Sequence, residues 1–278
     1  MRKIKIVSDS ACDIFSLGGV DFASAPMKII TKERQFTDDA ALDVSEMVDY
    51  LAKYKGKSKS SCPNTNDWLE AFGDADEVFC VTITSGLSGS YNSANAAKRI
   101  YEEENPGRRV FVIDTLSAGP EITLTVRKLG ELISEGLAFD EIAERIGEYL
   151  KKTGLVFMLK SLRNFANNGR VSPIVAKIIG FVVIAIVGKA SDAGTLETRH
   201  KCRGEARSLE TLVSEMRSEG YCGGRVSIGH CRNPEGAEKL SALIRQGFSD
   251  AEIEIHALRG LCSFYAEIGG ILVGFEKG

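Results

Sequence analysis

Apolar positions along the first 150 residues fall either in short runs or at helical spacing. The runs predict strands, and positions three or four apart predict amphipathic helices. We expect strands at residues 3–7, 25–31, 78–83 and 109–113, and helices at 44–54, 67–72, 91–100, 122–133 and 139–150. Strands that alternate with helices are typical of a mostly parallel sheet covered on both faces.

The second half of the chain continues this alternation. Strands are expected near 155–159 and at 196–200, 225–230, 253–257 and 270–275, and helices at 209–216 and 236–244. Between them, Gly169 should end one helix and Pro173 should begin the next. The apolar run 178–187 is about half as long as a membrane-spanning helix and indicates a buried strand or a helix-to-strand junction. We therefore expect an α/β fold with two domains, residues 1–158 and 159–278.

Composition narrows the classes of function. With 278 residues, 44% hydrophobic residues and a net charge of -3, the chain can bury large cores and has no basic surface for nucleic acid. The first residues enter a strand without the apolar block of a signal peptide, which predicts a cytoplasmic protein without a transmembrane segment. Seven scattered cysteines without a C-x-x-C and three widely separated histidines indicate neither a disulfide framework nor a metal site.

Small residues follow the strand at 78–83 and precede a helix. Ser85, Gly86, Ser88 and Gly89 lie in this connection, where free N–H groups at a helix N-terminus and serine hydroxyls suit a carboxylate or a phosphate. A tight strand-to-helix turn with a serine cap fits the pattern equally well.

Two other polar segments could contribute to a site. Ser60 and Ser61 precede Cys62-Pro63, and because the residue before proline is extended, we expect these serines on a loop. Asp9, Ser10 and Asp13 follow the first strand, where open α/β sheets place their ligands. Helix capping and turn formation explain these three residues at least as well.

A serine hydrolase is one alternative. Gly86-Leu-Ser-Gly-Ser90 nearly matches the G-x-S-x-G nucleophile elbow, and Ser88, Asp114 and His230 occur in the chain order of an α/β-hydrolase triad. The last glycine of the elbow is replaced by Ser90, which disfavours this alternative. Neither G-x-x-x-x-G-K-[ST] nor G-x-G-x-x-G occurs, which disfavours a nucleotide site.

Motifs spread over the chain resemble those of the bacterial DegV proteins. They are Val7-Ser-Asp-Ser-Ala-Cys-Asp13, Lys59-Ser-Ser-Cys-Pro63, Ser85-Gly-Leu-Ser-Gly-Ser-Tyr-Asn-Ser-Ala94, Val112-Ile-Asp-Thr115, Ser117-Ala-Gly119, Leu162-Arg-Asn164, Gly169-Arg-Val-Ser172 and Gly229-His-Cys-Arg-Asn-Pro234. They occur in the family's order over nearly the whole length. Each is weak alone, and their combination carries the resemblance.

The resemblance implies a two-domain protein, with a mixed or antiparallel sheet in the second domain, that binds one long-chain fatty acid between its domains. It also implies a non-catalytic binding subunit of a fatty acid kinase, which presents the carboxylate to a separate ATP-binding subunit. By position in the motifs, Ser60 and Ser88 would hold the carboxylate, and Arg170 would face the kinase subunit from the surface. Hydroxyls and loop N–H groups can bind a carboxylate by charge-assisted hydrogen bonds.

The chain departs from the family near its end. Where the family has His-x-Gly-Pro-Gly, this chain has Tyr265-Ala-Glu-Ile-Gly269. Tyr265 can donate one hydrogen bond but is not a cation near neutral pH. It either completes the carboxylate site or only packs in the core. A further alternative is therefore a regulatory interaction protein with a vestigial pocket.

Overall fold

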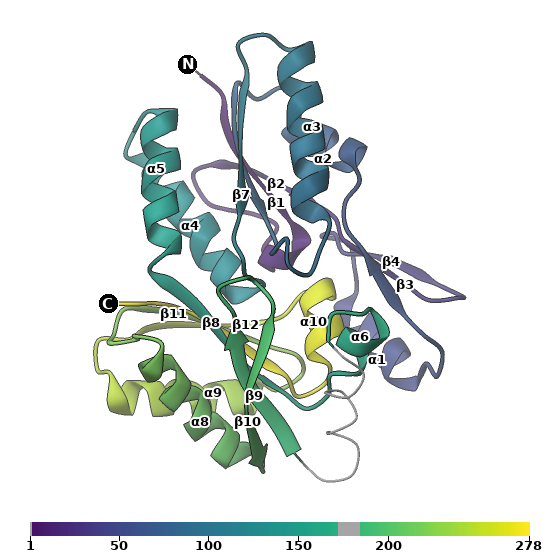
Figure 1. Ribbon diagram of the computed structural model, residues 1–278, viewed down its shortest axis with the longest axis vertical. Coiled ribbons are helices and arrows are strands. Elements are labelled where there is room, and N and C mark those ends of the chain that lie inside the picture. Colours follow the sequence, from purple (N-terminus) through teal and green to yellow (C-terminus); the bar gives the residue numbers. More distant parts are fainter. Residues whose placement is uncertain (1, 172–183) are drawn as a thin grey trace.

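Four parallel strands form the central sheet of the first domain. The computed structural model describes residues 2–171 and 184–278, and Figure 1 shows the two domains one above the other. The strand order is β2-β1-β6-β7, with β1 at Ile4–Asp9, β2 at Asp21–Ala25, β6 at Glu77–Thr82 and β7 at Arg109–Asp114. The predicted parallel sheet is confirmed.

Helices cover both faces of this sheet, and its strands are therefore buried on both sides. Val78 and Cys80 of β6 belong to the apolar cluster that contains Trp68 of α2. Phe79, between them, points the other way and packs on Phe139 of α5, with ring centroids 4.7 Å apart. The four covering helices are α2 (Thr65–Phe72), α3 (Ser90–Glu104), α4 (Pro120–Ser134) and α5 (Phe139–Leu150).

A small antiparallel sheet extends the first domain toward the second. Its order is β4-β3-β5, with β3 at Lys28–Ile30, β4 at Gln35–Thr37 and β5 at Lys59–Ser61. The prediction of one strand over 25–31 was wrong, because β2 ends at Ala25, β3 begins at Lys28, and Pro26 between them has no N–H for a strand ladder. Residues 21–24 of β2 were not predicted to form a strand. The expected loop at Ser60 and Ser61 was also wrong, since both residues pair with β3.

The second domain is built on a six-stranded mixed sheet of order β10-β9-β8-β13-β11-β12. β11 and β12 are parallel and the other neighbours are antiparallel. One face packs against two helices (Figure 1), and the other faces the first domain. The elements are β8 (Thr153–Leu159), β9 (Ile184–Ala190), β10 (Leu196–Arg203), α8 (Glu205–Ser218), β11 (Arg225–His230), α9 (Pro234–Gly247), β12 (Glu252–Ala257) and β13 (Ile271–Glu276).

The chain passes from the first domain to the six-stranded sheet of the second between Leu150 and Thr153, where α5 ends and β8 begins. By sheet membership, we propose a boundary there, a few residues before the expected division at 158/159. The helix start expected at Pro173 and the first part of the apolar run 178–187 lie outside the described residues, and the end of that run lies in β9. Within residues 2–171 and 184–278, the remaining elements are η1 (Ser10–Cys12), α1 (Val44–Lys53), α6 (Arg163–Asn167) and α10 (Gly260–Ala266).

Candidate functional site

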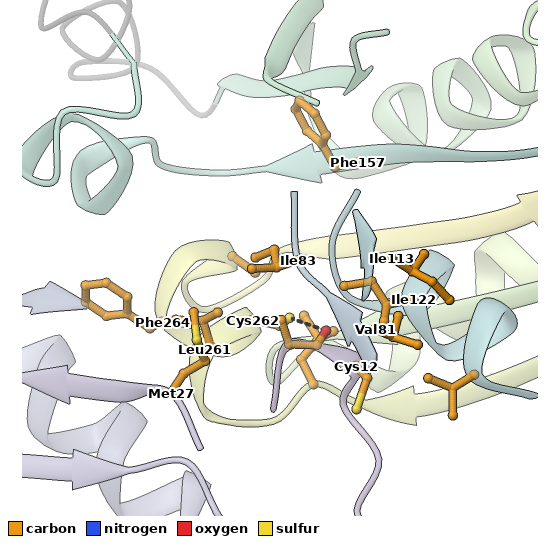
Figure 2. Close-up of a cluster of buried hydrophobic side chains, with 14 of the residues drawn as sticks. Cys12, Met27, Val81, Ile83, Ile113, Ile122, Phe157, Leu261, Cys262 and Phe264 are labelled. Carbon is orange, nitrogen blue, oxygen red and sulfur yellow. Dashed lines mark hydrogen bonds between the residues drawn. The ribbon is translucent and has the colours of Figure 1, made fainter. Parts of the chain in front are cut away.

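A largely apolar cavity of about 310 Å³ lies between the two domains. Figure 2 shows Phe157 of β8 on one side and Ile83, Leu261 and Met27 on the other. The volume falls in the usual range of small-molecule sites, roughly 300–1,000 Å³. Its large apolar lining residues are Met27, Ile83, Leu87, Leu116, Leu155, Phe157, Leu159, Phe165, Leu196, Leu261 and Leu272.

Ser60 and Tyr265 form one polar part of the cavity wall. Their hydroxyl oxygens are 2.7 Å apart, although the residues come from β5 and α10. The Ser60 N–H donates to the side-chain oxygen of Asn168 at 3.0 Å, which fixes β5 against the turn after α6. The Tyr265 ring packs on Phe165, with centroids 4.6 Å apart. Because two hydroxyls share one hydrogen bond, one O–H remains free to donate into the cavity.

Ser88 lies in the connection between β6 and α3 and also lines the cavity. Its side-chain oxygen accepts the N–H of Ser90 at 3.2 Å, so its own O–H is free to donate. Gly89 lines the cavity beside Cys62, because a Cβ at residue 89 would lie 3.4 Å from the Cys62 sulfur. The structure thus brings Ser60, Ser61, Ser88 and Tyr265 to one cavity.

Ser85 and Gly86 do not line it within the described chain. The Ser85 N–H donates to Asp114 at 3.0 Å, and the Gly86 N–H donates to the Thr84 hydroxyl at 3.0 Å. The Ser88 N–H donates to the Thr84 carbonyl at 3.2 Å. Most N–H groups of the connection are therefore bonded to other protein atoms. The Ser88 hydroxyl is the group of this connection that can bind a ligand in the cavity.

Arg170 lines the cavity with a half-buried side chain. The family resemblance implied that it faces a kinase subunit from the surface, and that contact stays a prediction. The turn after α6 folds it back, so that Nε donates to the Leu87 carbonyl at 2.9 Å and Nη1 donates to the Asn168 carbonyl. Among the described lining residues, Arg170 is the one charged side chain. Its motif gave no signal of this role, because the contact depends on two distant segments.

The pKa of Tyr265 is raised, mainly by burial, while its hydrogen bond to Ser60 and the Arg170 charge act in the opposite direction. Tyr265 therefore remains a neutral O–H donor at physiological pH. One cation and neutral hydroxyls suit a monoanion, with the remaining lining suited to an apolar chain.

Asp9, Ser10 and Asp13, which were candidate walls of the site, lie behind the cavity instead. All three are buried and none lines it. Asp9 Oδ2 accepts the Ile83 N–H at 2.9 Å and the Ser90 hydroxyl at 2.5 Å, which holds the connection that carries Ser88. These residues therefore position the site without facing a ligand.

Asp13 and Asp38 hold α10, which carries Tyr265. Asp13 accepts the Arg259 N–H at 2.7 Å, and Asp38 accepts the N–H groups of Gly260 and Leu261 at 2.9 and 2.8 Å. Figure 2 shows how closely Leu261 and Cys262 of α10 approach the first domain. Sequence reasoning missed Asp38 and α10, because a seven-residue helix without local caps has no clear pattern of its own.

Burial also raises the pKa values of these carboxyl groups. The pKa of Asp9 rises to about 6 and that of Asp13 to about 8, in both cases chiefly by desolvation. The pKa of Asp38 is raised for the same reason, against the hydrogen bonds from Leu261 and Gly260. Burial therefore makes each of the three carboxyl groups release its proton at a higher pH than an exposed aspartate would.

The hydrolase triad is not assembled. Asp114 accepts N–H groups of Ser85 and Leu116, and His230 Nδ1 accepts the Asn233 N–H at 3.3 Å. Ser88 bonds to Ser90 instead. Without a base bonded to the serine, the nucleophile has no activation.

Among the described residues, no cluster of three or more metal-ligating side chains occurs, and all seven cysteines are free. No helix in the described chain is long and apolar enough to cross a membrane.

Comparisons with known proteins agree with this architecture. The sequence model described as "Uncharacterised protein, DegV family" matches residues 3–277. A DegV domain-containing protein of Streptococcus pneumoniae is 44% identical over 276 residues, which cover 98% of each chain.

Two solved structures are similar over their whole length. One is a DegV family protein from Eubacterium eligens loaded with heptadecanoic acid (TM-score 0.96, 44% identity, 99% of this chain and 100% of that one). The other is the fatty acid kinase B3 protein of Streptococcus pneumoniae loaded with linoleic acid (TM-score 0.97, 43% identity, 100% of both chains). With its two sheets, its interdomain cavity and a family match that spans almost every residue, this chain belongs to the DegV family.

Proposed function

We propose that the cavity binds one long-chain fatty acid and that the protein is a non-catalytic lipid-binding protein. The observation that carries this proposal is the arrangement of one cation and several hydroxyls in the wall of an otherwise apolar cavity between two domains. The similar proteins loaded with heptadecanoic and linoleic acid support it. Each buried methylene contributes roughly 0.8 kcal/mol, so a long chain supplies most of the affinity.

The proposed carboxylate site consists of Ser60, Ser61, Ser88, Gly89 and Tyr265 together with Arg170. Arg170 supplies the charge, and Ser88 and the Ser60–Tyr265 pair supply O–H donors. The Ser61 hydroxyl donates to the Cys62 carbonyl at 3.1 Å, so it can accept but has no second proton to donate. Ser85 and Gly86 are left out, because they do not line the described cavity.

The test is direct. Protein is extracted with organic solvent, the extract is analysed by mass spectrometry, and the delipidated protein is titrated with fatty acids while its melting temperature is followed. We expect a co-purified fatty acid, and an increase in melting temperature on its return. An empty extract together with no shift for any chain length would contradict the proposal and favour a vestigial pocket.

We also propose that the protein presents the carboxylate to an ATP-binding kinase subunit, which forms the acyl phosphate. The similarity to the fatty acid kinase B3 protein supports this role. Delipidated protein, a long-chain fatty acid, ATP and a kinase subunit should together yield an acyl phosphate, which hydroxylamine traps as a hydroxamate. Product formed without the kinase subunit would contradict a purely binding role.

We place the protein in the cytoplasm. The seven free cysteines fit a reducing compartment, because an oxidising one favours disulfides.

A further inference from the structure

The hairpin of β9 and β10 reaches from the second sheet to the first domain. Its tip, residues 191–195, is closed by its own hydrogen bonds. The Ser191 N–H donates to the Thr195 carbonyl at 2.9 Å, and the Gly194 N–H donates to the Ser191 carbonyl at 2.8 Å. The tip is therefore a compact unit that can dock as a whole.

The tip docks on the connection between β6 and α3. The Thr84 hydroxyl donates to the Gly194 carbonyl at 2.8 Å. A Cβ at residue 86 would lie 2.6 Å from the Ala193 carbonyl oxygen, and a Cβ at residue 194 would lie 2.0 Å from the Thr84 hydroxyl oxygen. Gly194 also has φ +69, which favours glycine. The absence of a side chain at Gly86 thus serves the docking of the tip.

The tip lies at the end of the cavity away from Tyr265. Leu155, Phe157 and Leu159 line the cavity from one face of β8, and Leu155 and Leu159 are about 13 Å apart along the strand. Next to the Leu159 end is α6, whose Phe165 contacts the Tyr265 ring.

The opposite end of β8 lies beside the base of the tip. Lys189 pairs with Val156, so Ala190 follows at the level of Leu155. Ala190, Gly194, Thr195 and Leu196 all line the cavity, as does Leu116. At residue 194 a Cβ would lie 3.0 Å from the Leu116 Cα, so the tip and Leu116 close this end together.

We propose that the docked hairpin tip is the end wall of the cavity and sets the longest acyl chain that it accepts. The inference rests on the proposed fatty-acid binding. Each added methylene increases affinity until the chain reaches the tip. A longer chain must fold back or displace the tip, which breaks the bond from Thr84.

Two variants should move this limit in opposite directions. Gly86→Ala pushes the tip away and should lengthen the limit, whereas Ala190→Phe adds a ring to the wall and should shorten it. Gly147→Ala is the matched control, because a Cβ there meets nothing within 4 Å. Dissociation constants are measured for saturated acids from dodecanoic to eicosanoic acid, with melting curves for each variant.

We expect Gly86→Ala to bind the first acid beyond the wild-type limit at least tenfold more tightly, and Ala190→Phe to bind the acid at that limit at least tenfold more weakly. Dodecanoic acid should bind Ala190→Phe and the control as it binds the wild type. For Gly86→Ala, which lies two residues from Ser88, each dissociation constant is compared with that of dodecanoic acid in the same variant. If the dissociation constants changed equally at every chain length, or did not change, the role of the hairpin tip as end wall would be contradicted, and the proposed fatty-acid binding would not. Wild-type protein that binds no acid of any length would overturn the proposed function with it.

Discussion

The buried carboxyl groups and the cavity wall are built from neighbouring segments but use their polar groups differently. Asp9, Asp13 and Asp38 are buried, and each accepts hydrogen bonds from the backbone, with Asp9 also accepting the Ser90 hydroxyl. The hydroxyls of Ser88 and of the Ser60–Tyr265 pair retain a proton to donate into the cavity.

The difference shows how the fold keeps negative charge away from an anionic ligand. A protein carboxylate facing the cavity would repel a fatty acid carboxylate, whereas hydroxyls and Arg170 attract it. The acids instead hold the segments that carry those groups. Changes in the buried carboxyl groups should therefore alter stability, and changes in the cavity wall should alter affinity.

The largest effect is expected for Asp38→Ala. It leaves the buried N–H groups of Gly260 and Leu261 without an acceptor, at a cost of about 1–3 kcal/mol each. We expect urea unfolding to show a loss of about 2–5 kcal/mol. Asp21→Ala, at an exposed position, is the control. Equal stability of the two variants would contradict the role of Asp38 as the anchor of α10.

Arg170→Gln should weaken fatty acid binding by about 1.5–3 kcal/mol, because a hydrogen bond to a charged group is lost. Isothermal titration with hexadecanoic acid and with hexadecanol separates charge from packing. We expect the acid to lose affinity and the alcohol to bind almost as before. The same loss for both ligands would assign Arg170 a packing role only.

Stability should fall as the pH rises from 6.5 to 8. The pKa of Asp13 is raised to about 8 by burial, so the folded chain retains a proton that the unfolded chain has released. Protonated Asp13 therefore contributes stability that is lost as the pH rises through its folded pKa, roughly 1.5 kcal/mol over this range.

Urea midpoints at several pH values measure this loss, and Asp13→Asn should flatten the profile. The range starts at pH 6.5 because burial lowers the pKa of His256 to about 4, which has the opposite effect at lower pH. A profile that Asp13→Asn leaves unchanged would contradict the assignment.

Ser88→Ala should have the smallest effect on affinity, about 1 kcal/mol. Its hydroxyl contributes one donor, while Arg170 and the Ser60–Tyr265 pair remain. Ser85→Ala is the matched control, because Ser85 lies in the same connection but outside the described lining. Ligand titration should separate the two variants. Because Ser88→Ala also removes the acceptor of the Ser90 N–H, the titrations are run at a temperature at which the melting curves show both variants folded. Equal affinities would remove Ser88 from the proposed site.

Elements with a long or strongly periodic pattern were predictable. Three of the four strands of the parallel sheet (β1, β6 and β7), the helices α2 to α5, the strands β11 to β13 and the family all follow from local residues. The strands β2 to β5 and the helix α10 did not, because pairing with other strands, and capping by Asp38, stabilise them. Pro26 offered a signal that the prediction of a single strand over 25–31 did not use.

The sequence by itself determined the fold class, the family and the residues that could meet a carboxylate, because strand and helix periodicity and motif order are local properties. Only the tertiary structure decided which of them face the cavity. Asp9 and Asp13 are buried outside the cavity lining, Arg170 bonds to the Leu87 carbonyl, and Gly86 packs against the hairpin tip. These outcomes depend on contacts between segments some 80 to 250 residues apart, such as Arg170–Leu87 and Asp13–Arg259, which no local pattern encodes.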